Sequence, residues 1–167
     1  MLLGNQPQTN SNNPSEQYDE WIVQLLSGKQ YVEAYRLLKS EPPQKLSTLF
    51  NLALCLYFAE EYEQSLYQLD AALAKLQPNI TSNFSINDDL YKKLESKQNV
   101  DNSYMQGITD KYVRHFPYMV KSNILRMKID CYRALCQWNK IMELAAPLRN
   151  ENYRNVEEAV AEAIARM

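Results

Sequence analysis

The stretch that decides the fold runs from Leu46 to Asn79 and reads LSTLFNLALCLYFAEEYEQSLYQLDAALAKLQPN. Apolar residues recur at helical spacing in two runs, one on each side of Glu60-Glu61. Pro78 follows the second run, where a helix must stop. The stretch therefore predicts two amphipathic helices joined by a short turn.

The chain before this stretch predicts a second hairpin. Ser15 is a candidate N-cap, Gly28 breaks the helical pattern, and Pro42-Pro43 ends it. Residues 1–14 are rich in Asn, Gln, Ser and Pro, so we expect a disordered leader there. The rest of the chain, 15–167, is expected to form a single helical domain.

The chain after it is less regular at first. Residues 80–121 have weak periodicity and are interpreted as an insertion, with a short helix from Asp88 to Gln98 capped by Asn87. Strong periodicity returns over 122–150. Residues 155–167 predict a capping helix, with Asn155 and Glu158 in a capping-box pattern at its start.

Composition favours an all-α protein. The chain has 167 residues, of which 46% are hydrophobic and only 3 are glycine, whereas a sheet-rich fold needs more turn residues. Three cysteines, an odd number, are expected to be reduced and buried thiols of an intracellular, cytoplasmic protein. No apolar run is long enough for a membrane span, and the start does not have the pattern of a secretory signal.

The 34-residue stretch resembles one tetratricopeptide repeat (TPR). This family places large residues at repeat positions 4, 7, 11, 17 and 24 and small ones at positions 8, 20 and 27, and the matches are Leu49, Leu52, Ala53, Leu56, Tyr62, Ser65, Leu69 and Ala72. Repeats near 15–45 and 122–150 fit the pattern only in part, since Ile22 and Ile129 occupy positions meant for small residues. The resemblance implies a TPR-like array of helical hairpins with an insertion and a capping helix.

The resemblance also implies a partner-binding groove, because in this family the first helix of each repeat lines a concave surface. Carried over, the groove residues are Phe50, Leu54 and Tyr57 in the middle, with Asn51, Asp19, Arg126 and Arg133 around them. Such a surface, acidic at one end and basic at the other, suits a peptide or partner helix with an apolar anchor. The alternative is that the apolar middle is covered by the 80–116 insertion or by another copy of the chain.

The implied function is a non-catalytic adaptor or scaffold that binds a protein or peptide, without a cofactor or metal. A chaperone-tail receptor is not expected, because Asn51 matches that clamp but Asp19 would repel a carboxylate. A dedicated chaperone for a secreted client is one alternative. The other is an RNA-associated repeat protein, based on the basic residues of 111–140, namely Lys111, Arg114, Lys121, Arg126, Lys128, Arg133 and Lys140. Nucleic acid is the less favoured partner, and homo-oligomers remain open.

Overall fold

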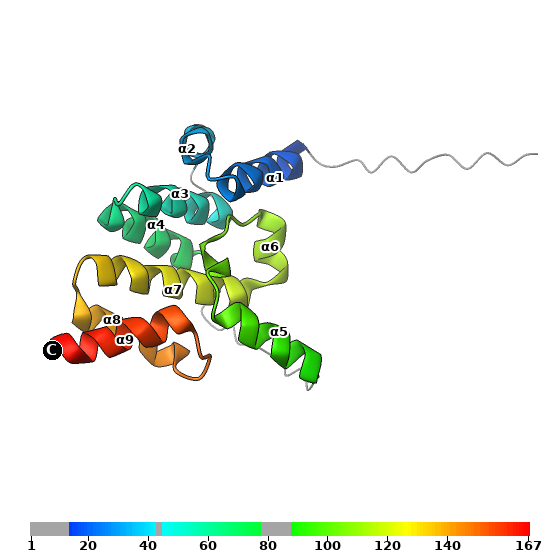
Figure 1. Ribbon diagram of the computed structural model, residues 1–167. Coiled ribbons are helices and arrows are strands. Elements are labelled where there is room, and N and C mark those ends of the chain that lie inside the picture. Colours follow the sequence, from blue (N-terminus) through cyan, green and yellow to red (C-terminus); the bar gives the residue numbers. More distant parts are fainter. Residues whose placement is uncertain (1–13, 43–44, 78–87) are drawn as a thin grey trace, which may run out of the picture.

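The computed structural model describes residues 14–42, 45–77 and 88–167, and over these ranges the protein is all-α (Figure 1). The expected leader, Pro14 excepted, lies outside the described residues, as do Pro78 and Asn87. The helices are α1 (Pro14–Ser27), α2 (Tyr31–Ser40), α3 (Leu46–Phe58), α4 (Tyr62–Ala74), α5 (Asp89–Asn99), α6 (Asp110–His115), α7 (Pro117–Ala134), α8 (Trp138–Ala145) and α9 (Arg154–Arg166), with 3₁₀ turns η1 (Ser103–Met105) and η2 (Ala146–Leu148).

Three helical hairpins, α1–α2, α3–α4 and α7–α8, have the same turn. One turn residue has a left-handed backbone in each case: φ is 58° at Lys29, 61° at Glu60 and 55° at Cys136. The next backbone N–H closes the same six-residue hydrogen bond, from Gln30 to Leu25 O (2.8 Å), from Glu61 to Leu56 O (2.9 Å) and from Gln137 to Tyr132 O (2.9 Å). This is the Schellman motif, which satisfies the last carbonyls of a helix.

The hairpins pack in chain order, with α9 against α7 and α8 at one end (Figure 1). Small residues allow close contact inside the middle hairpin, where Ala53, Ser65 and Ala72 are fully buried. The Ser65 hydroxyl donates to the Ala53 carbonyl at 2.9 Å, so its burial leaves no unpaired polar group. The buried thiol of Cys131 lies 3.7 Å from the same hydroxyl.

Several local predictions are wrong in detail. Cys55 and Cys131 are buried as expected, but Cys136 is exposed at a hairpin turn. α1 already begins at Pro14, so Ser15 is not its N-cap. Asp88 lies directly before α5 and caps it, accepting from the Leu90 N–H at 2.9 Å.

The long helix α7 begins at Pro117, five residues before the expected repeat start at Ser122. Proline suits the first turn of a helix because its missing N–H has no partner there anyway. Among the described helices, none combines the length and the apolar composition needed to cross a membrane.

Candidate functional site

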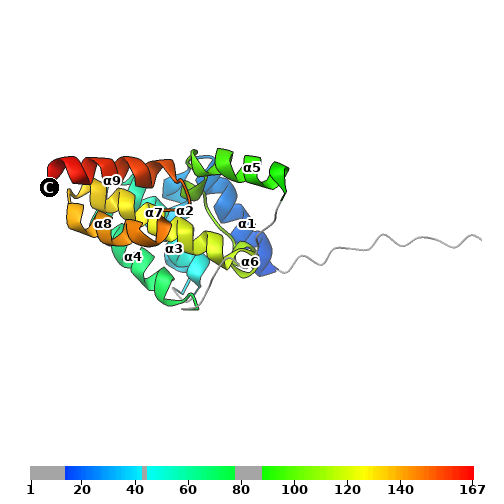
Figure 2. The ribbon, with the colours of Figure 1, turned by 90° about the horizontal axis from the view of Figure 1, so that it is seen from below.

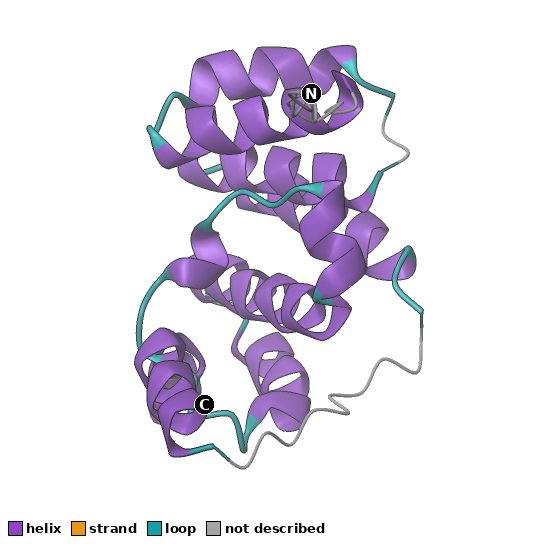
Figure 3. Cartoon of the chain, turned by 90° about the vertical axis from the view of Figure 1, so that its right-hand side faces the viewer, coloured by secondary structure: helices purple, strands orange, loops and turns teal. Residues whose placement is uncertain are grey.

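The predicted groove residues lie on one face of α1, α3 and α7, here called the inner face. This face is crossed by residues 99–116, the inserted segment, which comprises the C-terminal residue of α5, η1, an extended stretch and α6. α6 contacts α1, α3 and α7, and η1 contacts α7. Figure 3 views the array from the side on which the inserted segment lies.

Asn51 of α3 holds the extended part of the inserted segment. Its Nδ2 donates to the carbonyl oxygen of Ile108 at 2.8 Å, and its Oδ1 accepts from the Ile108 N–H at 2.9 Å. Both Asn51 and Ile108 are buried. The carboxamide thus pairs with both backbone groups of one residue, which a side chain can do only where the bound backbone is extended and unpaired.

A polar cluster fixes the start of α6. The Asp110 N–H donates to Asp19 Oδ2 at 3.3 Å, and the Ser47 hydroxyl donates to Asp110 Oδ1. Lys45 Nζ lies 3.3 Å from Asp110 Oδ2 and 3.5 Å from Asp19 Oδ1. One ammonium group therefore balances two carboxylates, and the inserted segment is tied to both α1 and α3.

Arg126 of α7 anchors the other end of the inserted segment. Its guanidinium carbon lies 3.9 Å from the centre of the Tyr104 ring and 4.3 Å from that of Tyr153, so it is held between two aromatic faces. The same group donates to Asn155 Oδ1 at 2.8 Å and to the Asp101 carbonyl at 3.1 Å. Only 2% of Arg126 is exposed, and burial lowers its guanidinium pKa despite the neighbouring tyrosines.

Asp130 completes this polar network. Its carboxylate accepts from the Tyr104 hydroxyl and from Asn155 Nδ2, the latter at 3.0 Å. Burial raises the pKa of Asp130, and these hydrogen bonds oppose the rise. Asn155 is therefore not the helix cap that its sequence position suggests: its side chain joins α9 to α7, and α9 starts without a side-chain cap.

Most of the predicted groove residues are buried in the described structure. Phe50 and Leu54 are buried in the same apolar cluster as Tyr104 and Ile108 of the inserted segment. Asn51, Asp19 and Arg126 are buried as well, with the contacts given above. The inserted segment therefore covers these residues, as in the alternative interpretation of the sequence.

The remaining two predicted residues are partly exposed. Tyr57 packs against the apolar cluster and makes an edge contact with the Tyr62 ring at 5.5 Å. Arg133 Nε lies 2.7 Å from Glu162 Oε2, and its Nη1 lies 3.7 Å from Glu158 Oε2, so its charge is matched by α9.

Close approach at Gly107 lets the inserted segment lie against α1. A Cβ at this position would lie 2.7 Å from Leu26 Cδ1 and 3.4 Å from the Val23 Cα. A cavity of about 290 Å³ remains beside this contact, lined by Val23 and Asn123 of the inner face and by residues of the inserted segment. This cavity is thus the part of the inner face that the inserted segment does not fill.

Sequence reasoning missed Tyr104, Ile108 and Tyr153 as parts of this site. Polar residues on the inner face of otherwise apolar helices are the available signal. Burying Asn51 or Arg126 without hydrogen-bond partners would cost free energy. The insertion is the part of the chain that the repeat pattern leaves without a place, so it could have been expected to supply these partners.

The basic residues of 111–140 do not share one open face. Arg126 is buried in the tyrosine pair, and Lys128 is buried with its Nζ 2.5 Å from Asp70 Oδ1. Arg114 and Lys140 pair with Glu16 and Glu143, and Arg133 pairs with α9. Most of the positive charge on which RNA binding would depend is therefore already matched by acids.

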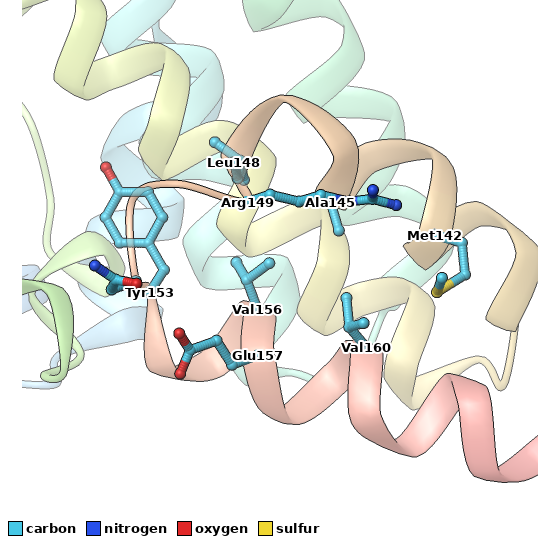
Figure 4. Close-up of a pocket in the computed structure, with 9 residues that line it drawn as sticks. Met142, Ala145, Leu148, Arg149, Tyr153, Val156, Glu157 and Val160 are labelled. Carbon is cyan, nitrogen blue, oxygen red and sulfur yellow. The ribbon is translucent and has the colours of Figure 1, made fainter.

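Two apolar hollows lie away from the inner face. The outer cleft, between α2, α3 and α4, has a volume of about 410 Å³ and is lined by Tyr31, Val32, Tyr35, Cys55, Leu56, Ala59, Glu61 and Gln64. The α8–α9 pocket (Figure 4) has a volume of about 110 Å³ and is lined mainly by Met142, Ala145, Leu148, Val156 and Val160, with Arg149 and Glu157 also lining it.

Neither hollow has the groups of a metal centre. Within the described ranges, no three His, Cys, Asp or Glu side chains are grouped so that they could hold a metal ion. His115 is exposed at the end of α6, with its ring 6.3 Å from that of Phe116.

Comparison of the chain with protein-family models, with curated proteins and with solved structures finds no match.

Proposed function

We propose that this protein is a non-catalytic interaction module of the TPR type, an adaptor or scaffold that binds a protein partner. The recurring turn at Lys29, Glu60 and Cys136 supports a repeat array, because three hairpins end their first helix in the same way. The pairing of Asn51 with the Ile108 backbone supports an inner face suited to holding an extended chain.

The inner face itself is an unfavourable place for an external partner. A competing peptide would have to replace the Asn51 pairing, the burial of Tyr104 and Ile108, and the ring contacts of Arg126. The inserted segment makes these contacts intramolecularly, so it has a large advantage in effective concentration over a separate peptide. We therefore propose that the partner surface lies elsewhere on the array.

The outer cleft is the observation that carries the proposal. Val32 is 79% exposed and Tyr35 is 40% exposed, while the Tyr31 ring stacks on Phe58 at 4.4 Å and forms a rigid wall. Exposed apolar groups gathered around a hollow are typical of protein-binding surfaces, and tyrosine is frequent at their centres.

Acidic residues define the chemistry of the partner. Glu61 lines the outer cleft, and Glu60 and Glu63 are exposed next to it in sequence. We therefore propose a polypeptide that inserts an aliphatic or aromatic side chain and carries Lys or Arg beside it.

Selection from a displayed random-peptide library, with the purified protein as bait, tests this function. Sequences with an apolar residue next to Lys or Arg should be enriched. Binding of the selected peptides should weaken by about tenfold or more in Val32→Asp, as expected when an interface anchor is lost, and by less in Glu61→Gln.

Phe116→Asp is the matched control, because Phe116 is also exposed and apolar but lies directly before α7, away from the outer cleft. It should leave peptide binding unchanged. Selected peptides that bind wild type and Val32→Asp equally well would contradict the proposal, as would a library without any enriched sequence.

The two alternatives gain no support of their own. Several of the basic side chains on which RNA binding would depend are paired with acidic side chains. The chaperone alternative predicts no structural feature that the adaptor proposal does not also predict.

A further inference from the structure

The helix α5 presents an apolar stripe that is left exposed in the described part of the structure. Leu90 is 63% exposed and Leu94 is 58% exposed, one helical turn apart. Asn99 is buried and lies about 160° around the helix from the middle of this stripe, at 100° per residue. Its Nδ2 donates to the Glu151 carbonyl at 2.6 Å. The face that meets the body is thus opposite to the leucines.

On α9, a second apolar stripe runs from the α8–α9 pocket to the exposed last turn of the helix: Val156 at its start is buried, whereas Ile164 and Met167 are exposed. Val156 and Val160 line the α8–α9 pocket, where Figure 4 shows both side chains directed toward Ala145 and α8. Ile164 continues the stripe at the same four-residue spacing and is 64% exposed, and Met167 is 74% exposed. Apolar residues at such spacing form a ridge that packs against another helix.

The two leucines of α5 span one helical turn, about 6 Å, and therefore match the spacing of Val160 and Ile164, which also lie four residues apart. The pocket of about 110 Å³ is apolar and large enough for an aliphatic side chain such as leucine.

The arrangement of the two helices prevents contact within one chain and favours it between two. α5 and α9 lie along the same side of the molecule and extend in opposite directions from the Asn99–Glu151 contact (Figures 1 and 2). A two-fold axis through this contact would lay the α5 of each copy over the α9 of the other. Such an interface is self-complementary and closed.

We propose that the protein forms a two-fold symmetric dimer in which α5 of each copy packs in the groove between α8 and α9 of the other. The helices are antiparallel in this arrangement, because α5 runs toward the axis and α9 runs away from it. Leu94 then meets Val160, and Leu90 meets Ile164. Lys97, at the edge of the leucine stripe, meets Glu157 at the rim of the pocket, and both are exposed in the single chain.

Sedimentation equilibrium of the full chain over a range of concentrations tests the proposal. Wild type should show a monomer–dimer equilibrium. Leu94→Asp should weaken dimerisation by on the order of a hundredfold, because each copy of the substitution buries a charge in an apolar pocket. Ser96→Asp is the matched control on the opposite side of α5 and should leave the equilibrium unchanged. Far-ultraviolet circular dichroism checks that both variants are folded.

A charge exchange tests the register. Lys97→Glu and Glu157→Lys should each dimerise about tenfold more weakly than wild type, since like charges then face each other twice per dimer. An equimolar mixture of the two variants should recover the wild-type affinity. In the mixed dimer, one contact pairs the two substituted side chains, which have opposite charges, and the other contact keeps the native pair.

Two kinds of result overturn this proposal. A wild-type chain that stays monomeric at all concentrations overturns the dimer. Loss of dimerisation in Ser96→Asp but not in Leu94→Asp, or a mixture without recovery, overturns the interface.

Discussion

The guanidinium of Arg126 stands between two tyrosine rings and donates to groups from the inserted segment and from α9. A planar group with several donors can stack on both rings and reach these acceptors at once. A lysine ammonium has no plane with which to stack between the two rings, and it cannot reach all of these acceptors at the same time. The type of side chain at this position therefore matters beyond its charge.

Arg126→Lys should lower the free energy of unfolding by about 2–4 kcal/mol, because the stacking is lost and buried acceptors are left unpaired. Arg133→Lys is the matched control in the same helix. Arg133 is partly exposed, so its ion pairs with α9 should be worth less than about 1 kcal/mol. Urea unfolding of both variants measures the difference, and equal losses would contradict the role given to Arg126.

The sequence predicts which residues share a helical face, but it does not predict whether that face is exposed. Helical spacing places Phe50, Asn51 and Arg126 on faces that the repeat pattern brings together. Their burial could not be derived, because it depends on Ile108 and Tyr104, which lie in a segment without periodicity. The contact from Asn51 to Ile108 spans 57 positions, and no local pattern encodes such a distance.

The hairpin turns place a non-glycine residue where glycine is favoured. Lys29, Glu60 and Cys136 all have φ between 55° and 61°, which is strained for side chains with a Cβ.

Glu60→Gly should therefore raise the free energy of unfolding by about 0.5–1 kcal/mol, as relief of backbone strain outweighs the added freedom of the unfolded chain. Ala59→Gly is the matched control one residue earlier, where φ is −87°. There glycine relieves no strain and should destabilise. Thermal unfolding measures both, and a lower melting temperature for Glu60→Gly than for Ala59→Gly would contradict the prediction.

Gly107 has no Cβ and therefore allows the extended part of the inserted segment to lie close against α1. Gly107→Ala should cost about 1–3 kcal/mol of stability, since the new methyl group meets the buried Leu26 side chain at 2.7 Å. Gly28→Ala is the control, because its Cβ would meet no atom closer than 3.4 Å and its φ is not left-handed.

Limited proteolysis adds a local measurement to this comparison. Cleavage between residues 99 and 110 should be faster in Gly107→Ala than in Gly28→Ala. An inserted segment equally resistant in both variants would mean that close packing at Gly107 is not required.

The observed helix boundaries agree with the predicted ones where the sequence has clear turn signals, and they differ where it has none. Helices α3 and α4 match the predicted hairpin around Glu60-Glu61. In the insertion, the weak periodicity gives no boundaries after Gln98, and the chain there forms the 3₁₀ turn η1, an extended stretch and then α6. Hydrogen bonds from α3 fix the backbone conformation of this stretch, so local helix propensity could not predict it.

At the scale of the molecule, buried acids set the response to alkaline pH. Burial raises the pKa of the Cys55 and Cys131 thiols to about 12, and that of Tyr57 to about 12. An acidic group with a raised pKa in the folded state contributes its full stability below its unfolded pKa and loses it as the pH rises toward the folded pKa.

Stability should therefore be constant from pH 7 to about pH 8.5 and fall above it, by at most about 1.4 kcal/mol per pH unit for each buried thiol. Urea unfolding at pH 7, 9, 10 and 11 gives the slope. Cys55→Ala should reduce the slope between pH 9 and 11, even if it lowers stability at pH 7. A slope unchanged by this substitution would contradict the burial of that thiol.

In the whole molecule, the inserted segment is part of the folded core and closes the inner face. Hydrogen exchange at the Ile108 amide tests this claim most directly, because that N–H donates to Asn51 in the interior of the protein. The structure predicts that Ile108 exchanges as slowly as the amides in the middle of α3. Exchange at the rate of an unstructured peptide would contradict the closed inner face.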